Sequence, residues 1–88
     1  AIRYSSDHIL DYIELDEEHA IFEISVPNGW VGKTIGQLDI RKKYDINIMA
    51  LKHNGVMNLR ISPDTYLPKD DTMLVLGDMK SIQKCFHI

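Results

Sequence analysis

The stretch that decides the fold is Val31-Gly-Lys-Thr-Ile-Gly-Gln-Leu-Asp-Ile-Arg-Lys-Lys-Tyr44, with the run Ile46-Asn-Ile-Met-Ala-Leu-Lys52 that follows it. Thr34 and Gln37 have the spacing of a capping box. In such a box the Thr hydroxyl accepts from the amide three residues on, and the Gln side chain reaches back to the Thr amide. The pattern predicts a helix over residues 35–43 and a strand over residues 46–52.

Two residues of the predicted helix indicate neighbours beyond the core. Gly36 lowers helix stability unless another segment must approach its backbone closely. Ile40 lies about 140° around the helix from Ile35, at about 100° per residue, which predicts that it faces away from the core. An apolar side chain there, next to Arg41, needs a second partner.

The run over residues 46–52 is apolar on both predicted faces, with Ile48 and Ala50 on one and Met49 and Leu51 on the other. A strand covered on both faces is central in a larger domain or lies at an interface. Because 88 residues supply little material to cover two faces, we expect a partner subunit to cover one of them.

The rest of the chain adds shorter signals. Asn54-Gly55 between strand-like runs predicts a hairpin turn, and Asp78 predicts a helix N-cap. The further predicted elements are a short helix or helix end over residues 6–15, strands over 20–26, 56–61 and 72–76, and a helix over 79–86. This order predicts a small α+β domain, β-α-β-β-β-α after the leading segment. Its mostly antiparallel sheet carries helices on one face, and the uncovered face leads us to expect a homodimer.

Composition excludes several classes of protein. The formal net charge of −3 argues against nucleic-acid polymers as partners, and Cys85 as the one cysteine excludes a disulfide framework and a cysteine-built zinc site. No run approaches the roughly 18 apolar residues that a membrane span needs. Because the sequence starts at Ala1 without an initiator Met, we expect it to be part of a larger protein.

Charge is unevenly distributed along the chain. Residues 1–26 carry seven acidic residues against Arg3 alone, whereas residues 27–60 carry six basic residues against two acidic ones. A cationic island of this size suits a small anion better than a polynucleotide. Two interpretations of Arg41 stay open, as an anion ligand or as part of an ordinary solvated surface; Lys42 and Lys43 are interpreted as solvated surface.

Motifs for catalysis and metal binding are missing. The glycines form neither a phosphate-binding loop nor a dinucleotide-binding motif, and the four histidines have no metal-ligand spacing. Asp70-Asp71 is interpreted as a solvated turn, and Cys85 as a packing thiol without a base beside it. We therefore predict no catalytic residues, no metal site and no enzyme activity.

The two opening stretches together resemble the RCK_C domain, also called the TrkA-C domain, of the cytosolic gating subunits of bacterial potassium channels and transporters. Pro63-Asp-Thr65 and the strand leading into Gly77 resemble a later block of the same family, so the similarity covers roughly residues 15–86. Residues 1–14 resemble the linker or helix from a preceding nucleotide-binding domain that this chain lacks. The resemblance therefore implies a linker over residues 1–14 and a regulatory domain over residues 15–88.

Three positions depart from the family pattern. Family members often have Gly where this chain has Asp45 and Asp70, and often Arg where it has His53. Asp is among the non-glycine residues that best tolerate a left-handed backbone, so we expect both turns to persist at modest cost.

The branch that the sequence most resembles regulates Ktr-type potassium uptake, and the resemblance implies that cyclic di-AMP binds between two subunits. One Arg41 from each subunit would match one phosphate through its planar guanidinium. Asn47 would donate to phosphate or ribose, and Asp39 with the Ile40 backbone would recognise the adenine. The apolar walls would come from Ile35, Ile40, Ile48 and Pro63.

Each assignment has a structural alternative. Taken one at a time, Ile35 and Ile48 are better interpreted as core residues, and Asn47 is interpretable as the partner of a backbone group. Arg41 is interpretable as one half of a surface ion pair with Asp39 or Asp45, worth about 0–1 kcal/mol. The ligand hypothesis depends on the joint placement of these residues.

The implied mechanism is that cyclic di-AMP joins two domains, changes their mutual angle and acts through residues 1–15 on the preceding domain, which closes a transporter pore. The implied partners are a second copy of the chain, in a ring in the full-length protein, and a membrane-embedded potassium transporter subunit. The implied location is cytoplasmic, at the inner face of the cell membrane without insertion. Two other hypotheses remain: a dimerisation module without ligand, and a sensor of a different small molecule or cation.

Overall fold

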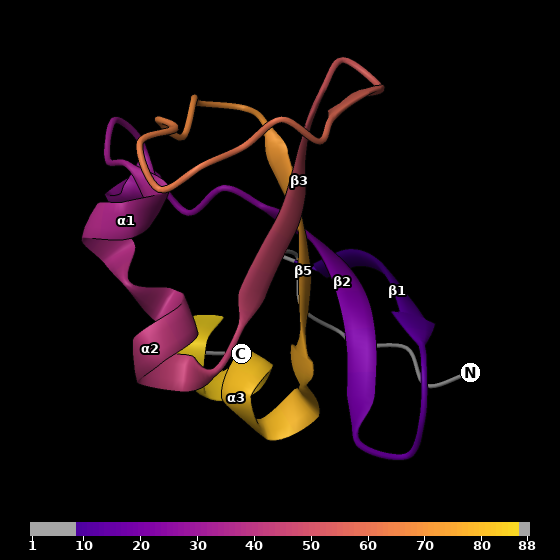
Figure 1. Ribbon diagram of the computed structural model, residues 1–88. Coiled ribbons are helices and arrows are strands. Elements are labelled where there is room, and N and C mark those ends of the chain that lie inside the picture. Colours follow the sequence, from indigo (N-terminus) through magenta and orange to yellow (C-terminus); the bar gives the residue numbers. More distant parts are fainter. Residues whose placement is uncertain (1–8, 87–88) are drawn as a thin grey trace.

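The computed structural model describes residues 9–86, which form a five-stranded antiparallel sheet with helices on one face (Figure 1). The spatial order of the strands is β1-β2-β5-β3-β4, so β5 joins two hairpins at the centre of the sheet. The elements in chain order are β1 (Ile9–Glu14), β2 (His19–Ser25), the 3-10 helix η1 (Asn28–Trp30), α1 (Ile35–Leu38), α2 (Ile40–Tyr44), β3 (Asn47–His53), β4 (Val56–Asn58), β5 (Thr72–Asp78) and α3 (Met79–Phe86). The predicted α+β fold is confirmed.

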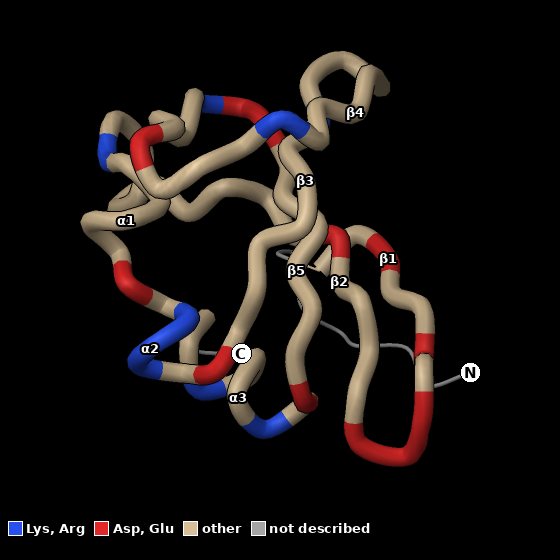
Figure 2. The backbone as a smooth tube through the Cα atoms, in the orientation of Figure 1, with Lys and Arg blue, Asp and Glu red and all other residues tan. Residues whose placement is uncertain are grey.

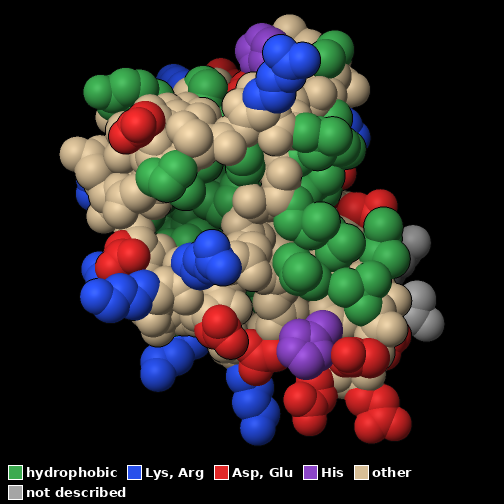
Figure 3. Space-filling model, viewed as in Figure 1, with side chains coloured by type: hydrophobic (Ala, Val, Ile, Leu, Met, Phe, Trp, Pro, Cys, Tyr) green, Lys and Arg blue, Asp and Glu red, His purple; other side chains and the backbone are tan. Residues whose placement is uncertain are grey.

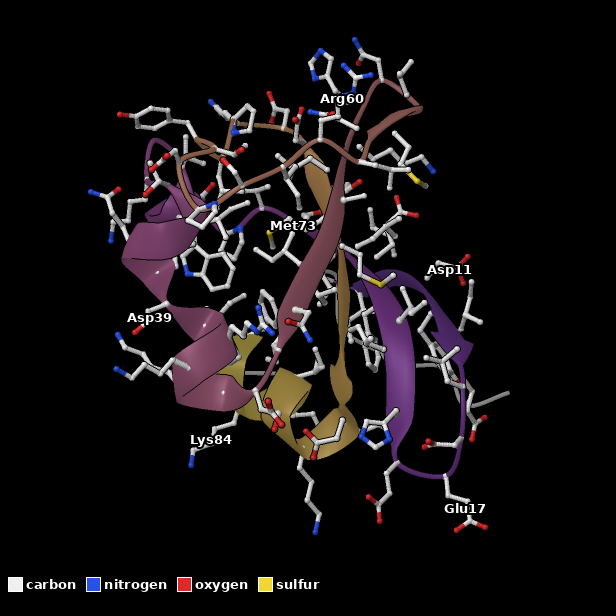
Figure 4. The ribbon with its side chains drawn as sticks, viewed as in Figure 1. Asp11, Glu17, Asp39, Arg60, Met73 and Lys84 are labelled. Atoms are coloured by element: carbon white, nitrogen blue, oxygen red, sulfur yellow. The ribbon has the colours of Figure 1, made fainter. Side chains whose placement is uncertain are left out.

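The core lies between the sheet and the helices. β2 alternates as predicted, with Ala20, Phe22 and Ile24 buried, and β5 contributes Met73 and Val75 to the same layer (Figure 4). α3 covers this layer with Ile82, Cys85 and Phe86. Its N-terminus is capped as predicted, since the Ser81 amide donates to Oδ1 of Asp78 over 3.3 Å.

The single helix predicted over residues 35–43 is wrong: two short helices meet there at Asp39. The predicted capping box is present, but the backbone of Asp39 is left-handed, with φ 51° and ψ 35°. This break changes the direction of the chain, so the position of Ile40 can no longer be counted from Ile35. Ile40 is 4% exposed and belongs to the core. The prediction that it faces away from the core, which assumed one continuous helix, is therefore wrong.

The helix predicted over residues 6–15 is also wrong where the structure describes it, since residues 9–14 form strand β1. Residues 6–8 lie outside the described residues. A register shift between Ile9 and Asp11 in the pairing with β2 marks a bulge at Leu10. The extra residue puts Ile9 and Tyr12 on the core side at a spacing of three, which imitates helical periodicity. The role of residues 1–14 as a linker stays a prediction.

A second bulge, between Ile48 and Ala50, changes the simple alternation predicted for β3. Ile48 pairs with Val75 and Leu51 pairs with Met73, so both lie on the core side, while Met49 is exposed. The Asn54-Gly55 turn is confirmed, with positive φ at both residues, but the return strand ends at Asn58 rather than at residue 61. No helix in the described range 9–86 is long and apolar enough to cross a membrane.

Candidate functional site

A cleft of about 420 Å³ lies where α1, α2, β3 and the segment over residues 61–63 meet. All seven residues predicted for the ligand site line this cleft: Ile35, Asp39, Ile40, Arg41, Asn47, Ile48 and Pro63. Ile40 and Ile46 are almost fully buried at its base, with exposed fractions of 4% and 0%. Figure 3 shows an apolar hollow rimmed by charged side chains. The fold therefore gathers the predicted residues at one concave site.

One wall of the cleft is a loop held against the first turn of α1. The amide of Ile35 donates to the Thr65 carbonyl over 3.0 Å, and the amide of Gly36 donates to the Pro63 carbonyl over 2.8 Å. Within the loop, the Ser62 amide donates to the Thr65 hydroxyl over 2.9 Å. These bonds satisfy amides that a helix start leaves without intrahelical partners, and they fix Pro63 on the wall.

The opposite wall depends on the left-handed turn at Asp39. Because the turn ends α1 and starts α2 in a new direction, Ile40 enters the core while Arg41 lines the cleft. Figure 4 shows Asp39 at the junction of the two helices, with its side chain directed outward. A non-glycine residue in this conformation costs about 1–2 kcal/mol and is common at functional sites.

The floor beside β3 is accessible because β4 is short. β4 pairs only with Leu51, Lys52 and His53 of β3. The residues of β3 that line the cleft, Asn47 and Ile48, lie outside this pairing. The edge of β3 that faces away from β5 is thus not covered by β4 along the cleft.

Arg41 is a cation without a paired anion in the described range. Among the ion pairs and side-chain hydrogen bonds of residues 9–86, none involves Arg41, so the alternative pairing with Asp39 or Asp45 is not observed. The three basic residues of α2 are exposed, and only Arg41 among them lines the cleft. Figure 2 marks the positions of these basic residues along the backbone of α2. An unpaired, planar guanidinium at an apolar hollow suits an oxyanion such as phosphate, two of whose oxygens can accept from it in parallel.

Four residues of the cleft were not predicted as site residues: Gly36, Ile46, Ile61 and Ser62. Gly36 carried a usable signal, because a glycine inside a helix indicates a close approach, which the structure confirms. Ile61 was missed because the strand predicted over residues 56–61 removed it from the loop that forms the wall. Ser62 was predicted to lie in that loop but was not recognised as a cleft residue.

Other titratable groups lie away from the cleft. Asp71, which is 4% exposed, accepts a hydrogen bond from Nδ1 of His53 at the end of β3. Burial raises the pKa of the Cys85 thiol to about 11, which leaves it protonated at neutral pH. The described residues contain no group of three or more His, Cys, Asp or Glu side chains arranged to hold a metal ion.

Comparison with known proteins shows which family this chain resembles. The model of the TrkA-C domain matches residues 20–87. The Ktr system potassium uptake protein C of Bacillus subtilis (strain 168) is 35% identical over 79 residues, covering 90% of this chain and 36% of that protein. The Ktr system potassium uptake protein A of the same organism is 31% identical over 80 residues, covering 91% and 36%. The chain thus spans about a third of the length of these relatives.

Solved structures have the same fold. The RCK C domain of the potassium transport protein KtrA, in complex with cyclic diadenosine monophosphate, has a TM-score of 0.73 and 29% identity, covering 82% of this chain and 86% of that one. The RCK_C domain dimer of S. agalactiae BusR, in complex with c-di-AMP, has a TM-score of 0.62 and 24% identity, covering 76% and 89%. At its lower identity the second structure supports the fold alone.

Proposed function

The chain belongs to the TrkA-C domain family, also called RCK_C, and on that premise we propose that it is the ligand-sensing domain of a cytosolic gating subunit for potassium uptake. The proposed ligand is cyclic di-AMP, bound in the cleft at the interface of a homodimer, and its effect is to inhibit potassium transport. The observation that carries the proposal is the unpaired Arg41 at the rim of an apolar cleft.

The symmetry of the ligand supports binding between two copies. Cyclic di-AMP is twofold symmetric, with two phosphates and two adenines, and a twofold interface presents the same residues twice. One Arg41 from each copy then neutralises one phosphate with a bidentate pair of charge-assisted hydrogen bonds. Asn47, which is exposed and lines the cleft, adds a donor for phosphate or ribose.

The apolar lining supports adenine as the second element of recognition. Ile35 and Ile48 are half-buried, so each has surface left to contact a planar base, and the exposed Pro63 also lines the cleft. The rim at Asp39 and the Ile40 backbone supplies polar groups for the adenine amino and ring nitrogens. A pocket with mostly apolar walls and few polar groups is typical of small-molecule sites.

The route from the cleft to a preceding domain runs through the sheet. In the proposal, closing two clefts around one ligand changes the angle between copies, and residues 1–15 carry that change to the rest of the protein. β1 is paired with β2 from Ile9 to Glu14, which ties this segment to the body of the domain. The ligand can shift the equilibrium between the two arrangements of the copies only as far as its affinities for those arrangements differ.

Calorimetry with cyclic di-AMP tests the proposal. We expect one ligand per two chains, and we expect Arg41→Ala to weaken binding about 100-fold, since each of two guanidinium groups contributes about 1.4 kcal/mol or more. Lys42→Ala is the matched control, because Lys42 is the next residue on α2 and does not line the cleft. We expect this variant to bind within about 2-fold of wild type.

Three outcomes would contradict the proposal. Absence of heat and of thermal shift at micromolar cyclic di-AMP would favour a dimerisation module without ligand. A larger thermal shift with a different nucleotide or with a cation would favour another sensor class. If Arg41→Ala binds cyclic di-AMP as tightly as wild type does, the ligand does not bind in this cleft as proposed.

A further inference from the structure

The loop over residues 62–67, whose first residues line the cleft, runs beside the start of α1 (Figure 1). Its alternate residues Pro63, Thr65 and Leu67 make backbone hydrogen bonds to residues 32–36 over 2.8–3.0 Å. Leu67 is 1% exposed, so core packing fixes the far end of the loop. The end that lines the cleft is exposed, and its position must therefore depend on hydrogen bonds.

Thr65 makes three hydrogen bonds that hold this exposed end. Its amide donates to the Ser62 carbonyl over 3.0 Å, which closes a four-residue turn with Pro63 at the second position, where a fixed φ is favoured. Its hydroxyl accepts from the Ser62 amide over 2.9 Å, and its carbonyl accepts from the Ile35 amide over 3.0 Å. Of the three, only the hydroxyl bond depends on the identity of the side chain.

We infer that Thr65 is a positioning residue of the cleft, whose hydroxyl fixes the Ser62 peptide, and with it Pro63, before a ligand arrives. Thr65 is half-buried and does not line the cleft, so it acts through its two neighbours in the turn and not by touching the ligand. A wall that is already ordered in the free protein spares the ligand the cost of ordering it, which raises affinity. The effect on affinity rests on the proposed function, whereas the ordering of the wall does not.

The first amides of α1 report on the wall without any ligand. Ile35 and Gly36 are the first two residues of the helix, so their amides have no intrahelical acceptor and donate to carbonyls of the loop instead. The Gln37 amide, one residue further, donates to the Thr34 hydroxyl of the capping box over 3.2 Å. Hydrogen exchange at these three amides therefore distinguishes a loosened wall from a frayed helix.

Hydrogen exchange of the ligand-free protein tests the ordering of the wall. Thr65→Val keeps the shape of the side chain but removes its hydroxyl, and we expect it to speed exchange of the Ile35 and Gly36 amides about 3- to 10-fold, the effect of one lost hydrogen bond. Exchange at Gln37 should not change, and Thr65→Ser, which retains a hydroxyl, should keep the wild-type rates. Wild-type exchange rates in Thr65→Val, or equal acceleration at Gln37, would overturn the inference.

Calorimetry with cyclic di-AMP tests the consequence for binding. We expect Thr65→Val to weaken binding about 3- to 10-fold and Thr65→Ser to bind within about 2-fold of wild type. Thr72→Val is the matched control, since Thr72 is also half-buried and its hydroxyl donates to Glu23, away from the cleft. That variant should leave the affinity and the three exchange rates unchanged, because the bond that it loses does not support the wall.

Two results of the calorimetry have different meanings. If Thr65→Val binds cyclic di-AMP as tightly as wild type does, or Thr72→Val loses as much affinity, Thr65 has no positioning role in binding and the inference is overturned. If wild type itself does not bind cyclic di-AMP, the proposed function fails. The exchange rates then still decide whether the Thr65 hydroxyl orders the wall, because they are measured without ligand.

Discussion

A Cβ atom added to Gly36 would stand 2.9 Å from the carbonyl oxygen of Pro63 and 3.1 Å from its Cβ atom. The same two residues are joined by the hydrogen bond from the Gly36 amide to the Pro63 carbonyl. The close contact between α1 and the cleft wall therefore requires glycine at position 36. It does so for reasons of space, because residue 36 is helical and its φ is not positive.

Gly36→Ala should consequently lower stability by about 1–3 kcal/mol, although Ala is the better helix former, because backbone atoms must move to admit the methyl group. The displaced Pro63 should also weaken binding of cyclic di-AMP. Chemical denaturation and calorimetry measure the two effects.

Gly29→Ala is the matched control, since nothing lies within 4 Å of its added Cβ atom and its φ is not positive. We expect that variant to equal or slightly exceed wild type in stability. Equal stability of Gly36→Ala and wild type would contradict the close contact.

Asp39 provides a second prediction, because its left-handed backbone separates α1 from α2. Asp39→Gly should keep or raise stability, whereas Asp39→Val should lower it by about 1–2 kcal/mol, since a β-branched side chain is strained at positive φ. Urea denaturation ranks the variants. Lys42→Gly is the control, for which we expect the opposite effect. Glycine within the helix α2 should lower stability by about 0.5–1 kcal/mol, because the backbone there does not need a positive φ. A less stable Asp39→Gly would show that the Asp side chain, and not the backbone, determines this junction.

Much of the site was predictable because it is local in sequence. Six of its seven predicted residues lie in the helix-and-strand block from Ile35 to Ile48, so correct assignment of that block brings them close together. The seventh, Pro63, came from the resemblance to the RCK_C family, because a contact across 27 residues leaves no periodic signal. The break at Asp39 went unrecognised, although the tolerance of Asp for left-handed backbone was correctly applied to Asp45 and Asp70.

The errors in β1 and β3 share one physical cause. Helical and extended segments were distinguished by the spacing of apolar residues, and a bulge adds one residue to that spacing. At Leu10 the bulge made a strand resemble a helix, and at Met49 it reversed the faces assigned to the residues that follow. A bulge is determined by pairing with a partner strand far along the chain, so it cannot be recognised from local periodicity.

The pair of His53 and Asp71 gives a third prediction. Asp71 is the one buried charged residue of the described range, and its side chain is 5% exposed, whereas that of His53 is 67% exposed. His53→Ala should lower stability by about 1–3 kcal/mol, because it leaves a buried carboxylate without its donor. His19→Ala removes a histidine from an exposed pair and should lower stability much less than His53→Ala does, because solvent screens the exposed pair. Denaturation midpoints compare the two, and equal losses would contradict the role assigned to burial.

The turn between β1 and β2 gives a prediction about pH. Hydrogen bonds from the Glu18 and His19 amides, and from the His19 ring, lower the pKa of Asp16, while the bond to Asp16 raises the pKa of His19. The Asp16 contribution is present above its unfolded value of 3.8 and is lost as pH falls through the lower folded pKa. The His19 contribution is present below 6.5 and is lost as pH rises through the higher folded pKa.

The pair of Asp16 and His19 should therefore stabilise the turn most between pH 3.8 and pH 6.5, the two ordinary pKa values. NMR titration of His19 should give a pKa above its ordinary value in the wild type, and Asp16→Asn should return it toward that value because the anionic acceptor is gone. Glu17→Gln serves as the control, since Glu17 belongs to the same turn but is not among the causes of the His19 shift. An unchanged His19 titration in Asp16→Asn would show that the pair does not form in solution. Because both side chains are at least half exposed, the midpoint of global unfolding should change little with this substitution.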